Sequence, residues 1–233
     1  MTGWQCVAVV VAAGKSSRMG GGKNKALFSL RGRPVLSYSL EILQRCPAVV
    51  SVAVVGREED RAEIEEVTQL WCAKAVGHFV RGGAERFESV RNGLEHFANA
   101  GVPAALIQDA ARPFLEERYI LDCLAALDHV PGCVVGVPLK DTLKETSPEA
   151  KVLATPDRQR FWLAQTPQVF RFEPLLLAYR ALNPPPYPTD DGAVLEERGE
   201  PVQMIMGSYH NIKITNPEDI ALVEAILGQR KDR

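Results

Sequence analysis

Short apolar runs alternate with amphipathic segments along most of this chain, and this alternation restricts the possible folds more than any other feature. The runs are mostly rich in Val, Ile and Ala, and they fall at residues 6–13, 49–55, 73–80, 104–109 and 133–138. Apolar runs of this length are typical of strands that are buried on both faces of a sheet. We therefore expect a central sheet that is covered by helices.

The segments between these runs carry apolar residues at three- and four-residue spacing among charged ones, as helices packed on a sheet do. They fall at residues 34–45, 58–70, 85–98 and 116–127. Repeated strand–helix–strand order predicts an α/β fold, with a mostly parallel, Rossmann-like sheet flanked by helices. With 233 residues, 46% of them hydrophobic, the chain can bury a sizeable core. We expect a single domain over residues 1–233.

The segment from about residue 140 to 160 interrupts this order. It is polar, contains Pro148 and Pro156, and follows a predicted strand without a clear crossover helix. A long excursion inside a compact domain is usually functional or takes part in an interaction. Regular patterns then return, with a helix over 172–182, a helix that starts at Thr189-Asp190-Asp191 and ends near Arg198, a strand over 202–206, and a helix over 217–227 closed by Gly228.

Composition excludes several classes of protein. The 27 Lys and Arg against 29 Asp and Glu give a net charge of −2, which argues against binding nucleic acid through bulk charge. The five cysteines contain no C-x-x-C pair, and the four histidines are scattered, so neither a disulfide framework nor a His-based metal cage is indicated. The longest apolar run, residues 6–13, is far shorter than the ~20 residues that a membrane span needs. We expect a cytoplasmic protein.

A glycine-rich loop follows the first predicted strand, over residues 12–25. It matches neither the dinucleotide fingerprint G-x-G-x-x-G nor the Walker A pattern, but it carries four cationic side chains, Lys15, Arg18, Lys23 and Lys25. Backbone N–H groups and cations directly after a strand are suited to surrounding a triphosphate. A surface loop with solvated charges is the alternative, and the position after the first strand favours phosphate binding.

Two further charged residues occupy positions that suit anionic ligands. Asp109 ends the fourth predicted strand, at the sheet edge where the glycine-rich loop lies, and a carboxylate there suits Mg²⁺ together with phosphate oxygens. A helix cap or a partner for Arg112 is the alternative role. Lys213 is flanked by Ile212 and Ile214 in a strand-like segment, where a second anionic substrate would give it a partner. Arg86 could have a structural role, in which it pairs with Glu85 or Glu88. Ser89 could reach a base or ribose, or it could form a hydrogen bond within its own helix.

The order of motifs along nearly the whole chain resembles a known family. The run Ala12-Ala13-Gly14-x-x-x-Arg18-Met19 with Lys25 is similar to the nucleotide loop of cytidylyltransferases. The motifs that follow in register are Gly82-Gly83-x-x-Arg86-x-x-Ser89-Val90, Asp109-Ala110-Ala111-Arg112-Pro113, Asp141-Thr142, Asp157-Arg158, Gln165-Thr166-Pro167-Gln168, Thr189-Asp190 and Asn211-Ile212-Lys213. Together they resemble the 2-C-methyl-D-erythritol 4-phosphate cytidylyltransferases of the non-mevalonate isoprenoid pathway.

The resemblance implies roles for individual residues. Arg18 and Lys25 would be the catalytic cations on the CTP phosphates, and Asp109 would help to bind Mg²⁺. Nucleotide contacts are implied for Ala12, Ala13, Gly14, Gly82, Ser89 and Asp109, and contacts with the sugar phosphate for Arg112, Thr142, Arg158, Thr166, Thr189 and Lys213. The segment 140–160 resembles the family's arm, which reaches across a homodimer, so that Thr142 and Arg158 would complete the partner's site. Ala84, Gln108 and His210 depart from the family pattern.

The implied reaction is an in-line attack by a substrate phosphate oxygen on the α-phosphorus of CTP, with pyrophosphate leaving. A phosphate monoester is largely ionised at neutral pH, since its second pKa is about 6, so no general base is required. Three alternatives remain at this point. The first is a cytidylyltransferase for another polyol phosphate such as ribitol 5-phosphate. The second is a glycosyltransferase of similar fold, although such enzymes usually carry a D-x-D motif, which Asp190-Asp191 does not form. The third is a non-catalytic nucleotide-binding module.

Overall fold

The centre of the computed structural model, which describes residues 3–14, 24–182 and 187–231, is a sheet of seven strands. Its order is β11-β7-β10-β6-β1-β4-β5. Six of the strands are parallel, and β10 runs antiparallel to both of its neighbours, β6 and β7. The strands are β1 (Cys6–Val11), β4 (Val49–Gly56), β5 (Phe79–Arg81), β6 (Ala104–Asp109), β7 (Gly132–Pro138), β10 (Trp162–Arg171) and β11 (Val202–Met206). The α/β fold class predicted from the sequence is confirmed.

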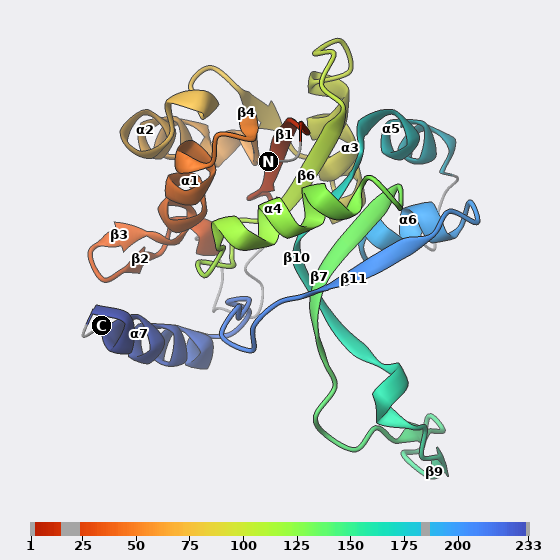
Figure 1. Cartoon of the computed structure of the whole chain (residues 1–233). Coiled ribbons are helices and arrows are strands. Elements are labelled where there is room, and N and C mark those ends of the chain that lie inside the picture. Colours follow the sequence, from red (N-terminus) through yellow and green to blue (C-terminus); the bar gives the residue numbers. More distant parts are fainter. Residues whose placement is uncertain (1–2, 15–23, 183–186, 232–233) are drawn as a thin grey trace.

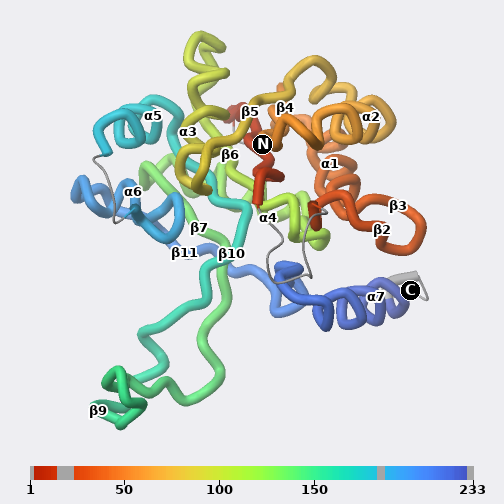
Figure 2. The backbone as a smooth tube through the Cα atoms, turned by 180° about the vertical axis from the view of Figure 1, so that it is seen from behind, coloured from red at the N-terminus to blue at the C-terminus, as the bar shows by residue number. Residues whose placement is uncertain are grey.

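Helices cover both faces of this sheet because successive strand residues point to opposite sides. Along β1, Cys6, Ala8 and Val10 pack into one apolar core, and Val7 and Val9 pack into the other. Figure 1 shows the face with α1, α2 and α4, and Figure 2 shows the opposite face with α3, α5 and α6. These helices are α1 (Val35–Arg45), α2 (Arg61–Trp71), α4 (Glu117–Ala126), α3 (Arg86–His96), α5 (Phe172–Ala181) and α6 (Asp191–Glu196).

A smaller apolar cluster attaches the C-terminal helix α7 (Pro217–Lys231) to a hairpin of β2 (Ser29–Leu30) and β3 (Arg33–Pro34). Leu30, Val223 and Ile226 are buried in it. Arg33 lies between two aromatic rings, 4.1 Å from the ring centre of Tyr38 and 3.9 Å from that of Trp71. This packing holds the hairpin directly after the 3₁₀ turn η2 (Lys25–Leu27), which follows the glycine-rich loop.

The predicted arm projects from the body between β7 and β10 (Figure 1). Its two short strands, β8 (Glu145–Thr146) and β9 (Val152–Ala154), pair with each other and with no part of the main sheet. Two apolar side chains on β9, Val152 and Leu153, are 60% and 64% exposed, so the arm buries almost none of its own apolar surface. Among the described residues, no helix is both long and apolar enough to cross a membrane.

Several predicted boundaries are wrong. The run at 73–80 is not one strand: residues 73–75 form the 3₁₀ turn η4 (Ala73–Ala75), Gly77 turns the chain at φ 79°, and only β5 joins the sheet. Gly228 does not end α7, which continues to Lys231. Residues 211–215 form no strand, and the prediction missed β10, whose alternation is hidden by the polar run Gln165–Gln168.

Candidate nucleotide-binding site

A cavity of about 400 Å³ opens at the carboxyl ends of β1 and β6, the edge at which open α/β sheets bind ligands. Its lining residues come from β1 and the start of the glycine-rich loop, from η2, from the start of α3, from the end of β6 and from the segment before α7. Seven residues predicted from the sequence to form the site line this cavity: Ala12, Ala13, Gly14, Lys25, Ser89, Asp109 and Lys213. Arg18 and most of the glycine-rich loop, residues 15–23, lie outside the described residues.

Asn24 fastens the far end of the glycine-rich loop to the sheet, and the sequence analysis missed it. Its buried Nδ2 donates to the carbonyl of Ala12, at the end of β1, over 2.6 Å, and to Asp60 Oδ2 over 2.9 Å. Its Oδ1 accepts from the N–H of Ala26 over 3.1 Å, so Asn24 also caps η2. The two ends of the loop are thereby joined, and Lys25, the residue after Asn24, lines the cavity.

Arg57 adds a second cation to this side of the cavity. It follows β4, and its guanidinium binds Asp60 through Nε at 2.7 Å and Nη2 at 3.0 Å. Asp60 therefore joins Arg57 to Asn24. Nothing in the sequence singles Arg57 out, because it lies in the charged stretch Arg57–Arg61, which has the composition of an ordinary helix start.

Asp109 is the acidic centre of the cavity. Its Oδ1 lies 3.2 Å from Arg86 Nε and its Oδ2 lies 2.7 Å from Lys213 Nζ. Burial by itself would raise the pKa of Asp109, but Arg86 and Lys213 outweigh that effect and hold the pKa well below its usual value. Lys213 thus has a partner within the chain, whereas the sequence analysis proposed a second anionic substrate as its partner.

Arg86 connects Asp109 to a second, fully buried carboxylate. Its Nη1 and Nη2 donate to Asp191 Oδ1 and Oδ2 over 2.8 and 2.7 Å, and the hydroxyl of Tyr179 donates to Asp191 Oδ1 over 2.5 Å. The alternative role of Arg86 as a partner of Glu85 or Glu88 is wrong. Asp191, Tyr179 and this use of Arg86 were not predicted, because Arg86 lies on a helix about a hundred residues before the helices that carry Tyr179 and Asp191.

The start of α3 and the residues just before it form one wall of the cavity. Glu85 and Glu88 form a capping box, in which Glu88 Oε2 accepts from the N–H groups of Ala84 and Glu85 over 2.6 and 3.2 Å. Ser89 Oγ donates to Glu85 O and accepts from Gly83 N–H, each over 3.1 Å, so it bonds within its own helix start. Gly82 packs behind this wall, where a Cβ would lie 2.6 Å from the Cβ of Ala13.

Two more of the predicted substrate residues, Arg112 and Thr166, belong to a buried polar cluster beside the cavity. Thr166 Oγ1 accepts from the N–H of Asp109 over 3.1 Å, and Arg112 Nη1 donates to Asn211 O over 2.6 Å. Arg112 Nε and Asn211 Oδ1 are buried and have no hydrogen-bond partner among the described residues. Thr189 is exposed just before α6, next to Asp190, which caps that helix through Ala193 N–H.

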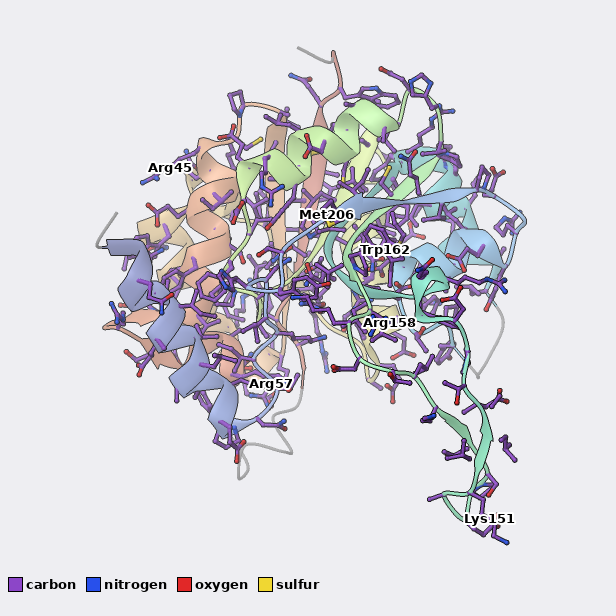
Figure 3. All side chains as sticks on the ribbon, turned by 60° about the horizontal axis from the view of Figure 1, so that its bottom comes forward. Arg45, Arg57, Lys151, Arg158, Trp162 and Met206 are labelled. Atoms are coloured by element: carbon purple, nitrogen blue, oxygen red, sulfur yellow. The ribbon has the colours of Figure 1, made fainter. Side chains whose placement is uncertain are left out.

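Thr142 and Arg158 do not line the cavity. Both are exposed on the arm, where Arg158 Nη1 donates to the carbonyl of Lys140 over 2.6 Å. In Figure 3, Arg158 lies at the base of the arm and Lys151 at its far end, while Arg57 marks the cavity side of the body. Within one chain, the structure does not bring the two arm residues together with Lys25 and Asp109.

The cavity could bind a divalent cation if one carboxylate, that of Asp109, supplies a ligand and the phosphates of a nucleotide supply most of the others. Among the described residues, no group of three or more His, Cys, Asp or Glu side chains could hold a metal by itself. Mg²⁺ on a nucleotide typically needs only one or two protein carboxylates, and Asp109 supplies one that stays ionised. Each of its oxygens retains a second lone pair besides the one that faces Arg86 or Lys213.

A Rossmann-like sheet with a cavity of this size, lined by cations and one ionised carboxylate at the strand ends, defines a nucleotide-binding α/β protein. Residues 6–229 match the sequence model of the 2-C-methyl-D-erythritol 4-phosphate cytidylyltransferases. The chain belongs to this family, and it is therefore an enzyme of the nucleotidyltransferase class.

Individual relatives agree with this assignment. The 2-C-methyl-D-erythritol 4-phosphate cytidylyltransferase of Synechococcus elongatus is 41% identical over 225 residues, which are 96% of each chain. That of Syntrophotalea carbinolica is 41% identical over 226 residues, 96% of this chain and 97% of the relative. The 4-diphosphocytidyl-2C-methyl-D-erythritol synthase of Anaerococcus prevotii has a similar solved structure, with a TM-score of 0.85, 28% identity and 97% of both chains covered.

Proposed function

We propose that this enzyme transfers the cytidylyl group of CTP to 2-C-methyl-D-erythritol 4-phosphate, giving 4-diphosphocytidyl-2-C-methyl-D-erythritol and pyrophosphate. Family membership supports the reaction class and the names of the relatives support the substrates. The observation that carries the proposal is the cavity at the ends of β1 and β6, in which Arg86 and Lys213 pair with one ionised carboxylate and Lys25 lines the same cavity. A site of this charge suits two phosphate substrates that repel each other.

The chemistry that the site must perform is mainly electrostatic. A phosphate oxygen of the second substrate attacks the α-phosphorus of CTP, the bond from that phosphorus to the bridging oxygen breaks, and the electron pair leaves with pyrophosphate. The attacking oxygen is already ionised at neutral pH, since the second pKa of a phosphate monoester is about 6. Positioning and charge stabilisation therefore replace proton transfer.

Lys25 is proposed to neutralise the CTP phosphates and the charge that develops on the leaving pyrophosphate. Its place in η2, which the Asn24 cap fixes beside the cavity, supports this role. We propose the same role for Arg18, on the basis of its place in the glycine-rich loop. For the nucleotide itself, we propose contacts with the residues at the end of β1 and the start of α3, which are Ala12, Ala13, Gly14, Gly82 and Ser89.

Asp109 is proposed to hold Mg²⁺ on the CTP phosphates. When bound, the cation supplies charge neutralisation between the phosphates of the two substrates. The depressed pKa of Asp109 supports the assignment, because the carboxylate stays ionised at any pH at which the substrates carry their full charge.

The second substrate is proposed to bind beside Asp109, between Arg112, Thr166, Thr189 and Lys213. The buried Nε of Arg112, without a partner among the described residues, supports an anionic ligand there. Thr142 and Arg158 are proposed to reach the corresponding site of a second copy, because both lie on an arm that leaves its own body. The exposed Val152 and Leu153 support a homodimer formed through this arm.

We further propose that residues 1–233 act as one nucleotidyltransferase domain and that the enzyme works in the cytoplasm. All five cysteines are free and buried, which suits a reducing compartment. Burial also raises the pKa of the Cys133 thiol to about 12, which keeps this thiol protonated and unreactive.

Pyrophosphate release with CTP and a panel of polyol phosphates tests the proposed reaction. Methylerythritol phosphate is expected to give the highest kcat/KM by a clear margin. A preference for ribitol 5-phosphate would assign the enzyme to another polyol phosphate, and binding of CTP without pyrophosphate release from any acceptor would mean a non-catalytic module. Nucleotide choice is checked in the same assay with ATP, GTP and UTP.

A further inference from the structure

Asp191 is the most deeply buried charged residue that contacts the site, and the mechanism above gives it no role. Its side chain is 0% exposed, although it lies at the start of α6 rather than in the sheet. Both of its oxygens face the guanidinium of Arg86, at 2.8 and 2.7 Å. A buried carboxylate is costly unless it is paired and hydrogen-bonded, and this one is paired in the bidentate geometry that Arg favours.

Arg86 is shared between two carboxylates. Its two terminal nitrogens are committed to Asp191, and only Nε, at the longer distance of 3.2 Å, reaches Asp109. Burial would lower the pKa of Arg86, but Asp191 and then Asp109 raise it above its usual value, so the guanidinium is permanently charged. Its strongest contacts are thus directed away from the cavity.

The surroundings hold Asp191 firmly in this position. Tyr179 donates to its Oδ1, and Gln168 Oε1 accepts from the backbone N–H groups of Asp191 and Gly192, each over 3.0 Å. Gln168 Nε2 also donates to Asp190 Oδ2 over 3.0 Å. The carboxylate therefore cannot follow Arg86 if the guanidinium moves toward Asp109.

We propose that Asp191 is a positioning residue that keeps the guanidinium of Arg86 from closing on Asp109, and so keeps the Asp109 carboxylate available to a divalent cation on the CTP phosphates. Without Asp191, Arg86 loses its bidentate partner and turns to the remaining carboxylate. Asp109 would then be neutralised by two full-strength cations, Arg86 and Lys213, and would bind a metal less well. This inference rests on the proposed metal role of Asp109.

The test measures how much Mg²⁺ tightens CTP binding, without any turnover. Calorimetric titration of CTP into the enzyme is done with Mg²⁺ and with EDTA, in the absence of the second substrate, and the ratio of the two affinities is the metal enhancement. In Asp191→Asn, we expect this ratio to fall on the order of tenfold, as is usual when the partner of a metal-binding group is lost. CTP affinity in EDTA is expected to stay equal or to rise, because Arg86 is still present.

A matched control exists on the same two helices that carry Arg86 and Tyr179. Glu95 of α3 and Arg180 of α5 form a similar bidentate pair, with both N–O distances 2.7 Å, outside the site. Glu95→Gln should leave the metal enhancement unchanged. Asp191→Glu, which keeps the charge, should retain most of it.

The double variant Arg86→Gln, Asp191→Asn separates competition for Asp109 from a merely structural role. It removes both charges, so it leaves no buried ion unpaired and is expected to fold even if Asp191→Asn does not. Its metal enhancement should return to the wild-type value or exceed it, because no guanidinium competes for Asp109. An enhancement as low as that of Asp191→Asn, or an unchanged enhancement in Asp191→Asn itself, would overturn the inference.

Failure of the proposed function has a different signature. Asp109→Asn should abolish the metal enhancement. If Asp109→Asn retains the full wild-type enhancement, or the wild type has none, then the metal role of Asp109 is wrong, and the role inferred for Asp191 is wrong with it. If Asp109→Asn abolishes the enhancement and Asp191→Asn does not change it, only the inference about Asp191 fails.

Discussion

Lys213 Nζ lies 2.7 Å from Asp109 Oδ2, so the lysine assigned to a substrate phosphate is paired with the carboxylate assigned to the metal. The pair joins the segment before α7 to the end of β6, two parts of the chain about a hundred residues apart. A phosphate that enters beside them competes with Asp109 for Lys213. Under the roles proposed for these two residues, the two substrates would therefore be linked electrostatically before either one reacts.

Replacing Lys213 with Met should weaken binding of the polyol phosphate. A hydrogen bond to a charged group contributes about 1.5–3 kcal/mol, so KM for this substrate is expected to rise roughly tenfold to a hundredfold. KM for CTP should change much less. Steady-state kinetics with each substrate varied in turn checks this, and an equal rise in both KM values contradicts the assignment.

Lys25→Ala should lower kcat on the order of a hundredfold or more, which is the typical cost of losing one group that stabilises transition-state charge. The fold should be intact, because Lys25 lines the cavity and belongs to none of the apolar cores. Circular dichroism and the melting temperature check the fold. Lys151→Ala, at the far end of the arm, is the control for loss of a lysine, and near-normal turnover of Lys25→Ala refutes the role.

Asn24→Ala removes the cap of η2 and the bonds that close the glycine-rich loop. Loss of the cap alone costs about 1 kcal/mol, which lowers the melting temperature by about 2–4 °C in a chain of this length. CTP affinity should fall together with kcat, because Lys25 loses its fixed position. Asn24→Asp keeps the acceptor for Ala26 but loses the donor to Ala12 and places a charge beside Asp60. It should therefore be impaired too, and wild-type kinetics in both variants would contradict the role of Asn24.

Mixing two inactive variants tests whether the arm completes a partner's site. Lys25→Ala and Arg158→Ala should each be nearly inactive alone. After the two are unfolded and refolded together, mixed dimers contain one intact site, so activity should recover to roughly a quarter of the wild-type level if pairing is random. No recovery, with mixed dimers demonstrated by mass spectrometry, would place Arg158 and Lys25 in the same site of one chain or outside the site.

The pH dependence should follow the substrate and not Asp109. Asp109 has a lowered pKa in the folded protein, so the stability that its ion pairs contribute is present above the unfolded pKa of 3.8 and is lost as pH falls below it. The acid limb of kcat/KM should instead fall near the second pKa of the phosphate monoester, about 6. A phosphonate analogue, which has a higher second pKa, should move this limb upward. An unmoved limb would point to a titrating enzyme group.

The sequence predicted those parts of the fold that local pattern determines. The buried strands β1, β4, β6 and β7 and the helices α1 to α5 follow from runs and spacing. The antiparallel strand β10 was missed because Gln165, Thr166 and Gln168 are buried polar residues, and their burial depends on partners such as Asp109 N–H and Asp190. A pattern of alternating hydrophobicity cannot reveal such a strand.

In the candidate site too, some residues could be predicted from local sequence pattern and others could not. Lys25, Asp109 and Lys213 were found because each follows or flanks an apolar run, and the structure brings them to one cavity. Asp191 and Tyr179 carry no such signal, since the contacts of Asp191 with Arg86 and with Tyr179 are made only after three helices have packed. Arg18 was also predicted, but it lies outside the described residues, so its role stays a prediction.

The pairing of Pro138 with Trp162 means that the whole arm is the connection of a hairpin between two neighbouring strands of the main sheet. The entropic cost of closing such a connection grows slowly, by about 0.6 kcal/mol for each doubling of its length. Trimming the connection to a tight turn, or extending it, should therefore leave the folding equilibrium of the body almost unchanged. The stability of the body therefore places little constraint on the shape of this segment, and an engineer could graft another projection onto the same two strands.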